Sequence, residues 1–161
     1  MRGSRFLRNA LIGAVVLWCG TVHAQTWKAT GAFGWLGVGK AYEIGKGHQY
    51  WLGEISGSFA NDKGQGSLFD HAGSKCPGFN DVDGIHNKSR AGGYCVLSDP
   101  DGDQAFMTYQ CEGNAVSCSG TADFAGGTGK YKDVAGHNTF VAHVLVMWPD
   151  GTMSGYSTWN R

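Results

Sequence analysis

Short stretches of alternating apolar and polar residues recur along the chain after residue 25, and turn-forming residues separate them. An alternation of period two is typical of half-buried strands, whereas the chain lacks long runs with apolar residues at the helical spacing. The pattern predicts strands at Thr26–Phe33, Gln49–Ala60, Gln65–Ser74, Ser89–Ser98, Asp103–Cys111, Ser117–Phe124, Asn138–Trp148 and Thr152–Asn160.

The connections between these strands differ in length. Gly34–Gly47 is predicted to be a glycine-rich connection with room for one short irregular strand, and Pro77–Lys88 a polar loop. Asn61–Gly64, Asp99–Gly102 and Pro149–Gly151 have the composition of tight turns. Eight successive antiparallel strands with little helix favour an all-β, up-and-down barrel, because closure leaves no exposed sheet edge.

Successive connections in such a barrel alternate between its two ends. Gly34–Gly47, Pro77–Lys88, Glu112–Val116 and Pro149–Gly151 therefore share one end, and the turns near residues 61 and 99 share the other. The first end has the longer connections. We expect any mouth of the barrel to lie there, since ligands enter small barrels past their loops.

Residues 1–24 have the features of a secretory signal peptide. Arg2, Arg5 and Arg8 precede the apolar run Ala10–Cys19, and Val22-His23-Ala24 offers small residues for cleavage before Gln25. The apolar run is too short to span a bilayer comfortably. We predict that residues 25–161 form a single exported domain, located in the periplasm or secreted.

The net charge of the mature chain limits the classes of molecule that it is expected to bind. Cleavage before Gln25 would remove three arginines, which leaves the mature chain slightly acidic and without a basic patch. This composition argues against nucleic acid and against anionic membranes as partners of the mature protein. No histidine or carboxylate spacing fits a metal site, and no motif fits a cofactor, so we predict neither.

The mature chain retains four cysteines, an even number that suits disulfides in an oxidising compartment. Three pairings are formally open. Cys111 and Cys118 flank a predicted hairpin loop and could bridge its two strands, which would leave Cys76 to pair with Cys95. Zinc is the weaker alternative, because no CxxC occurs.

Glu54 is the candidate for acid–base chemistry. It lies mid-strand, and it shares a face with Tyr50. If that face lines the barrel, Glu54 is a buried carboxylate beside a phenol, with Arg90 and Tyr109 as candidate partners. The alternative, which we favour, is that Glu54 faces solvent on an ordinary half-buried strand.

The glycine-rich stretch Phe124–Gly136 organises the C-terminal third. Gly126-Gly127 ends a strand, Thr128 can start a helical or 3₁₀ turn, and Tyr131 and Val134 would then point inward and plug one end of the sheet. A phosphate-binding loop is the rejected alternative. Phe124 occupies the place of its first glycine, and a tyrosine follows Lys130 where serine or threonine is needed.

Within this stretch, GGTGKYKDVAG resembles the signature of the allene oxide cyclase barrel-like superfamily, which includes allene oxide cyclases and, more distantly, dirigent proteins. Asp133 departs mildly from the pattern of bacterial members. The resemblance implies an eight-stranded barrel. Relatives that form trimers make a homo-oligomer an expectation. Allene oxide cyclases use an interior carboxylate, which the resemblance does not align with Glu54.

Two hypotheses of different classes follow. In the first, the barrel is a binding module whose aromatic interior holds a small apolar or aromatic molecule. In the second, it is a cofactor-free isomerase or cyclase acting on such a molecule. A polar cluster converging in the barrel would favour the enzyme. A completely filled interior would favour a structural envelope protein without a ligand.

Overall fold

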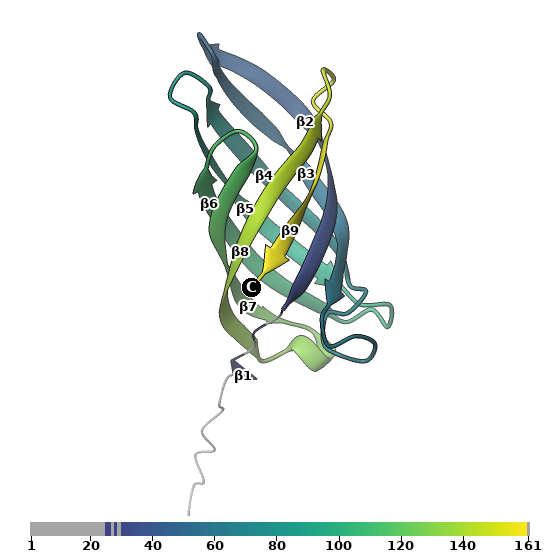
Figure 1. The fold of residues 1–161 in the computed structure, drawn as a ribbon. Helices are drawn as coiled ribbons and strands as arrows, with labels where there is room; N and C mark the ends of the chain where they lie inside the picture. Colours follow the sequence, from purple (N-terminus) through teal and green to yellow (C-terminus); the bar gives the residue numbers. More distant parts are fainter. Residues whose placement is uncertain (1–24, 27, 29, 161) are drawn as a thin grey trace, which may run out of the picture.

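The computed structural model describes residues 25–26, 28 and 30–160, so the predicted signal peptide at residues 1–24 lies outside the described residues. Figure 1 shows a β-barrel with a short 3₁₀ helix at one end. The elements are β1 (Gln25–Thr26), β2 (Gly31–Gly45), β3 (His48–Asn61), β4 (Gly73–Asp83), β5 (Lys88–Ser98), β6 (Gln104–Gly113), β7 (Ser117–Gly127), η1 (Gly129–Tyr131), β8 (Val134–Met147) and β9 (Met153–Trp159).

Eight antiparallel strands, β2 to β9, close the barrel, which confirms the predicted fold class. Each strand pairs with the next along the chain, and β9 closes the ring by pairing with both β8 and β2. The two-residue strand β1 adds to β8 in parallel. Closure gives every long strand two neighbours, so the barrel has no long open edge.

Three predicted segments were wrong on the N-terminal side of the barrel. The predicted connection Gly34–Gly47 is mostly strand, because β2 runs to Gly45 and pairs with β3 along its length. The predicted strand Gln65–Ser74 is mostly loop, whereas the predicted polar loop Pro77–Lys88 is largely strand β4. The predicted number of strands is still correct, because these errors shift the positions of strands and loops without changing the number of chain reversals.

Glycines of β2 and β3 make space for a large side chain of β3. A Cβ at Gly39 would stand 2.6 Å from the Trp51 ring, and a Cβ at Gly53 would stand 2.4 Å from it. Trp51 is buried, and its Nε1 donates to the Gly151 carbonyl at 2.8 Å. The glycine-rich composition that resembled a loop therefore reflects close packing across a strand.

Loop 62–72 cannot continue a strand because two of its residues are left-handed. Phe69 has φ 64° and Phe69 is 1% exposed, and His71 has φ 59°. Asn61 holds the loop: its side-chain amide donates to the Leu68 carbonyl at 2.9 Å, and its backbone N–H donates to Asp70 Oδ1 at 3.1 Å. The loop thus turns Phe69 inward under the barrel.

The turns divide between two ends of the barrel. The hairpin end carries the turns at residues 46–47, 84–87, 114–116 and 148–152, and the plug end carries loop 62–72, the turn at residues 99–103 and the segment 128–133. Aromatic side chains pack tightly at the plug end. Phe69 stacks on Tyr131 at 4.4 Å and on Phe124 at 5.1 Å, and Trp159 stacks on Phe140 at 5.3 Å between ring centroids.

Candidate functional site: the barrel cavity

Alternation along the strands directs one set of side chains into the barrel, where they enclose a cavity of about 110 Å³. All eight long strands contribute to its wall. The wall is mostly apolar and strongly aromatic. Its inward-facing aromatic residues are Phe33, Trp35, Trp51, Phe59, Phe69, Tyr109, Phe124, Phe140 and Trp159.

The plug end closes the cavity. Tyr131, which is 1% exposed, donates its hydroxyl hydrogen to Asp99 Oδ2 at 2.7 Å and accepts the Phe69 backbone N–H at 3.1 Å. Lys130 pairs with Asp99 and also reaches Asp101 Oδ2 at 2.7 Å. Burial, together with the hydrogen bond to Asp99, raises the pKa of Tyr131 above its usual value. The predicted inward plug of Tyr131 and Val134 is confirmed, since both are buried.

The ion pairs of Lys130 account for two carboxylates of the turn at residues 99–103. Asp99 and Asp101 bind Lys130, and the hydrogen bonds to these two carboxylates raise the pKa of the Lys130 ammonium. Among the described residues, no cluster of three or more histidine, cysteine or acidic side chains could hold a metal ion. Asp99 and Asp101 are thus partners of the protein's own cation.

Burial of the wall varies toward the hairpin end. Several wall residues near it are only partly buried, among them Asn80, Ala91, Cys118, Ala142 and Val144, whereas Trp51 and Met153, beside the turn at residues 148–152, are buried. Each of the four turns at the hairpin end also carries an exposed apolar residue at or beside the tip. They are Ile44, Ile85, Val116 and Trp148, which are 58%, 63%, 62% and 43% exposed.

The sequence analysis expected the longer connections, and with them any mouth of the barrel, at the hairpin end. The expected loop lengths were wrong: the connections there are tight hairpins, and the longest one, loop 62–72, lies at the plug end. That long connection closes the barrel because Phe69 folds into it. Loop length therefore gives no support to a mouth at the hairpin end.

Tyr109 lies in the cavity wall, on the inner face of β6. Its hydroxyl reaches the position that a Cβ of Gly78 would occupy, at 2.2 Å, and its ring edge lies 3.0 Å from the corresponding position at Gly93. The phenol therefore extends across β5 and β4, in the space that the missing side chains of Gly93 and Gly78 leave free. Burial raises its pKa to about 12, so the phenol stays protonated at neutral pH.

Three polar atoms in the wall are buried without a hydrogen-bond partner in the described part of the chain. They are Tyr109 Oη, Ser74 Oγ and Trp159 Nε1. All three can donate a hydrogen bond, and the two hydroxyls can also accept one. Leaving such groups unpaired is costly in an apolar interior, so each needs a partner that fits inside the barrel.

Glu54 lies on the outer surface, as the favoured alternative held. Its carboxylate pairs with Lys75 at 3.2 Å and accepts the Ser56 hydroxyl at 3.0 Å. Lys75 chiefly, and then Ser56, hold the pKa of Glu54 below its usual value. The condition for a buried catalytic carboxylate, an inward-facing even face of β3, is therefore not met.

Tyr50 and Arg90 are also outside. Both lie against Phe79 on the outer surface: the Tyr50 ring stacks on it at 5.7 Å, and the Arg90 guanidinium lies 5.8 Å from its centroid. Arg90 reaches Asp81 at 3.6 Å. Of the four candidates, Tyr109 alone faces the cavity, and the barrel wall separates it from the other three.

The two predicted disulfides are present. Cys76–Cys95 joins β4 to β5, and Cys111–Cys118 joins β6 to β7. All four cysteines line the cavity wall. Two disulfides indicate an oxidising, non-cytoplasmic environment.

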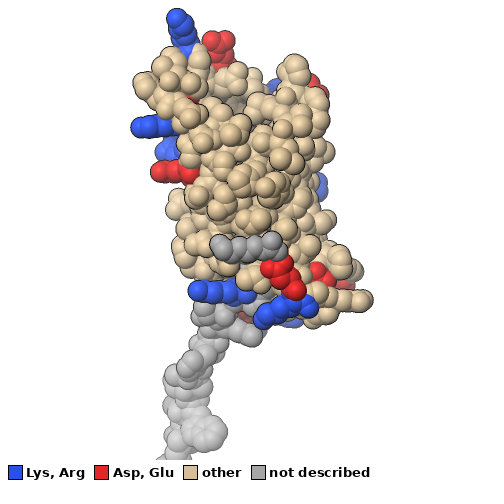
Figure 2. Space-filling model, viewed as in Figure 1, with Lys and Arg blue, Asp and Glu red and all other residues tan. Residues whose placement is uncertain are grey.

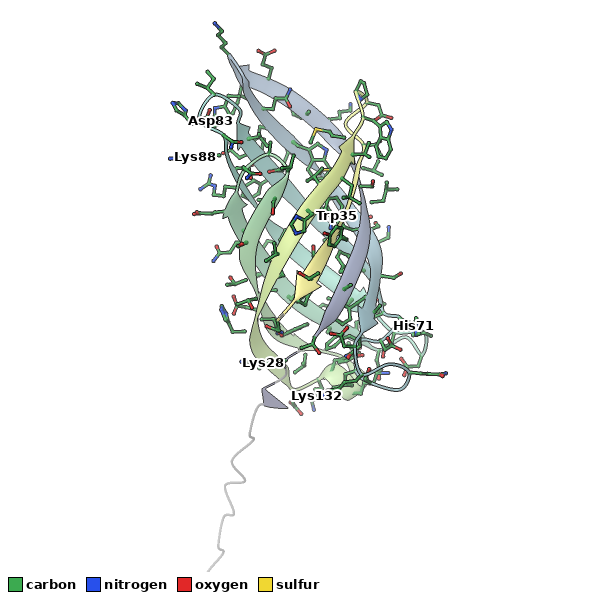
Figure 3. All side chains as sticks on the ribbon, viewed as in Figure 1. Lys28, Trp35, His71, Asp83, Lys88 and Lys132 are labelled. Carbon is green, nitrogen blue, oxygen red and sulfur yellow. A yellow bond between two sulfur atoms is a disulfide. The ribbon has the colours of Figure 1, made fainter. Side chains whose placement is uncertain are left out.

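Sequence reasoning did not single out Ser74 or Trp159. For Trp159 a signal existed, because Met153, Gly155, Ser157 and Trp159 alternate with outward residues and are all buried. Ser74 gave no such signal, because its strand was predicted to end at that residue. Figure 3 shows how the side chains line the two faces of the strands, with Trp35 labelled midway along the barrel.

Comparison with known proteins gives no further identification: no protein-family model and no curated protein matches the chain. Within the described residues, no helix is long and apolar enough to cross a membrane.

Proposed function

We propose that the protein is an exported carrier or receptor that binds a small, neutral, apolar or aromatic molecule inside the barrel. The observation that supports this most is the cavity lined by aromatic side chains and closed by a plug at one end. Concave, largely apolar sites with a few polar atoms are typical of small-molecule binding.

We place binding ahead of catalysis because of the chemistry of the wall. The ionisable side chain facing the cavity in the described residues is Tyr109, whose pKa of about 12 keeps it protonated. A protonated phenol can orient a ligand by a hydrogen bond. A general base would need a group that gives up its proton near neutral pH.

The test places a bulky side chain at each of two neighbouring positions of β8, one facing the cavity and one facing outward. Ala142 lines the cavity, whereas Val141 points to the outer surface of β8. We expect Ala142→Phe to abolish binding of toluene, measured by tryptophan fluorescence and by calorimetry, and Val141→Phe to leave it intact. Circular dichroism controls for folding. Failure of the wild-type protein to bind any apolar ring compound would contradict the proposal and favour a structural barrel.

Export is the second part of the proposal. It rests on the pattern of residues 1–24 and on the two disulfides. When the full chain is expressed in a Gram-negative host, we expect mature protein in the periplasmic fraction with Gln25 as its first residue. An intact N-terminus on protein retained in the cytoplasm would overturn this part.

We also propose, on its glycine-rich motif, that the chain is a distant relative of the allene oxide cyclase barrels. The motif supports this through its place in the fold: Gly126, the penultimate residue of β7, has φ 88°, and Gly129–Tyr131 forms the 3₁₀ turn that carries Tyr131 inward. Turnover of an unsaturated fatty-acid epoxide by the purified protein would be the activity to test. We rank that activity second, because Glu54 lies outside the barrel.

A further inference from the structure

We infer that the ligand is a neutral single-ring molecule bearing a hydrogen-bond acceptor, of the aryl ketone or aryl aldehyde class. This inference rests on the proposed function and adds the chemistry of the ligand to it. Three properties of the cavity carry it: its size and shape, the unpaired polar atoms in its wall, and the absence of charge among the described lining residues.

Size and shape favour one planar ring. A dry apolar cavity of about 150 Å³ accommodates benzene, so the smaller cavity of about 110 Å³ sets an upper limit of one ring with a small substituent and excludes fused rings and long chains. Tyr109 extends along the wall over Gly93 and Gly78, in the space that two side chains would otherwise fill. A planar ligand can stack against such an aromatic surface, since offset aromatic pairs are favourable.

The unpaired polar atoms of the wall indicate which functional group the ligand carries. Trp159 Nε1 can only donate, and Tyr109 and Ser74 also carry hydroxyl hydrogens. A ligand that offers an acceptor, such as a carbonyl oxygen, satisfies at least one of these donors. A pure hydrocarbon leaves all of them unpaired, so a site of this kind discriminates against it.

Charge excludes the carboxylate analogues. The described residues that line the cavity include no lysine, arginine or histidine to pair with an anion. A carboxylate would have to lose its hydration without gaining a counter-charge, which is strongly unfavourable in an apolar interior. We therefore expect the ketone to bind and the acid of similar size to be rejected.

The experiment compares three probes of nearly the same shape: acetophenone, ethylbenzene and benzoate. Calorimetry on the disulfide-bonded mature protein gives each dissociation constant. We expect acetophenone to bind about fivefold to tenfold more tightly than ethylbenzene, the ratio that one net hydrogen bond gives. Benzoate should show no binding at concentrations that saturate with acetophenone.

Three variants then locate the donor: Tyr109→Phe, Ser74→Ala and Trp159→Phe. Loss of the ketone preference in one of them, with ethylbenzene affinity unchanged, supports the inference. Tyr156→Phe is the matched control, because Tyr156 is 39% exposed on the outer surface of β9. The first two variants remove one hydroxyl each and keep the test decisive if Trp159→Phe does not fold.

The outcomes separate the two claims. Equal binding of acetophenone and ethylbenzene overturns the inference and leaves the proposed function standing, and so does a preference that survives in all three variants. Tight binding of benzoate also overturns it. If no probe binds and Ala142→Phe changes nothing, the proposed function itself fails.

Discussion

At the scale of single residues, glycine decides how the barrel interior is filled. Gly39 and Gly53 admit the Trp51 ring, and Gly78 and Gly93 admit the Tyr109 ring. Large aromatic side chains thereby lie along the wall without blocking the centre. The cavity depends on these paired choices as much as on the aromatic residues themselves.

Gly39→Ala tests this packing. Its new Cβ would meet the Trp51 ring at 2.6 Å and the Leu52 carbonyl at 2.3 Å, so we expect a loss of stability of about 1–3 kcal/mol. Gly34→Ala, on the same strand, is the control, because a Cβ there meets nothing within 4 Å. Denaturant midpoints measure both. Equal midpoints for the two variants would show that Trp51 does not need Gly39.

The Tyr109 phenol makes stability depend on alkaline pH. Burial raises its folded-state pKa to about 12 from the ordinary value of 10.0. A raised pKa stabilises the fold fully below about pH 10, and this contribution is lost as the pH rises toward 12. We expect Tyr109→Phe to lose less unfolding free energy than wild type between pH 9 and 11.5 in urea titrations, by about 1–2 kcal/mol. Parallel pH curves for the two proteins would contradict the burial of this phenol.

At the scale of elements, neighbouring strands are joined by side chains as well as by the backbone. The disulfides tie β4 to β5 and β6 to β7, and outer ion pairs link β3 to β4 through Glu54 and Lys75. The plug connects elements far apart in the chain, since Asp99, Tyr131 and Phe69 meet there. These links stabilise a β-rich topology that has many long-range contacts.

The two disulfides should differ in how much each contributes to the free energy of unfolding. Cys76–Cys95 spans 19 residues and Cys111–Cys118 spans 7, and a longer loop loses more unfolded-state entropy when it is closed. We expect the Cys76→Ala/Cys95→Ala variant to lose about 3 kcal/mol of stability, and the Cys111→Ala/Cys118→Ala variant somewhat less. Urea denaturation of both variants, with and without reductant, provides the comparison. A larger loss for the short-loop pair would point to packing rather than loop closure as the cause.

At the scale of the whole molecule, the two ends of the barrel differ. The plug end is sealed by buried aromatic rings and by the ion pairs of Lys130, whereas the hairpin end carries exposed apolar residues at its four turns, together with charged residues such as Lys46, Asp83 and Lys88. The middle of the face in Figure 2 bears neither acidic nor basic side chains. Under the proposed function, a ligand would enter at the end opposite the plug.

Closure itself can be tested by removing β9. This strand pairs with β2 on one side and β8 on the other, so a chain that ends at Gly151 exposes two long unpaired edges. We expect this truncation to aggregate or remain unfolded, as judged by size-exclusion chromatography and circular dichroism. A monomeric, folded truncation would mean that the other seven strands form a stable open sheet.

The architecture was predictable from the sequence. Alternation predicted the all-β class, turn residues near positions 61, 99, 114 and 149 predicted the strand count, and the cysteine spacing suggested, among three possible pairings, the one that the structure has. The inward plug was also readable, because Gly126-Gly127 and the aromatic that follows have strong local preferences. These features depend on local backbone conformation and on period-two patterning, which are properties of short segments.

The tertiary structure alone decided what faces the interior. The glycine-rich sequence of β2 predicted a loop. In the structure it is a strand, because Trp51 from the next strand fills the space beside Gly39. Phe69 was predicted to lie in a strand. In the structure, hydrogen bonds from Asn61 and to Tyr131 hold loop 62–72 in a conformation with left-handed residues. The sequence left the side of Glu54 open, with solvent favoured, and named Tyr109 only as a candidate partner; the register of the closed barrel places Glu54 outside and Tyr109 inside. Register depends on contacts between strands distant in the chain, so a single strand's pattern does not fix it.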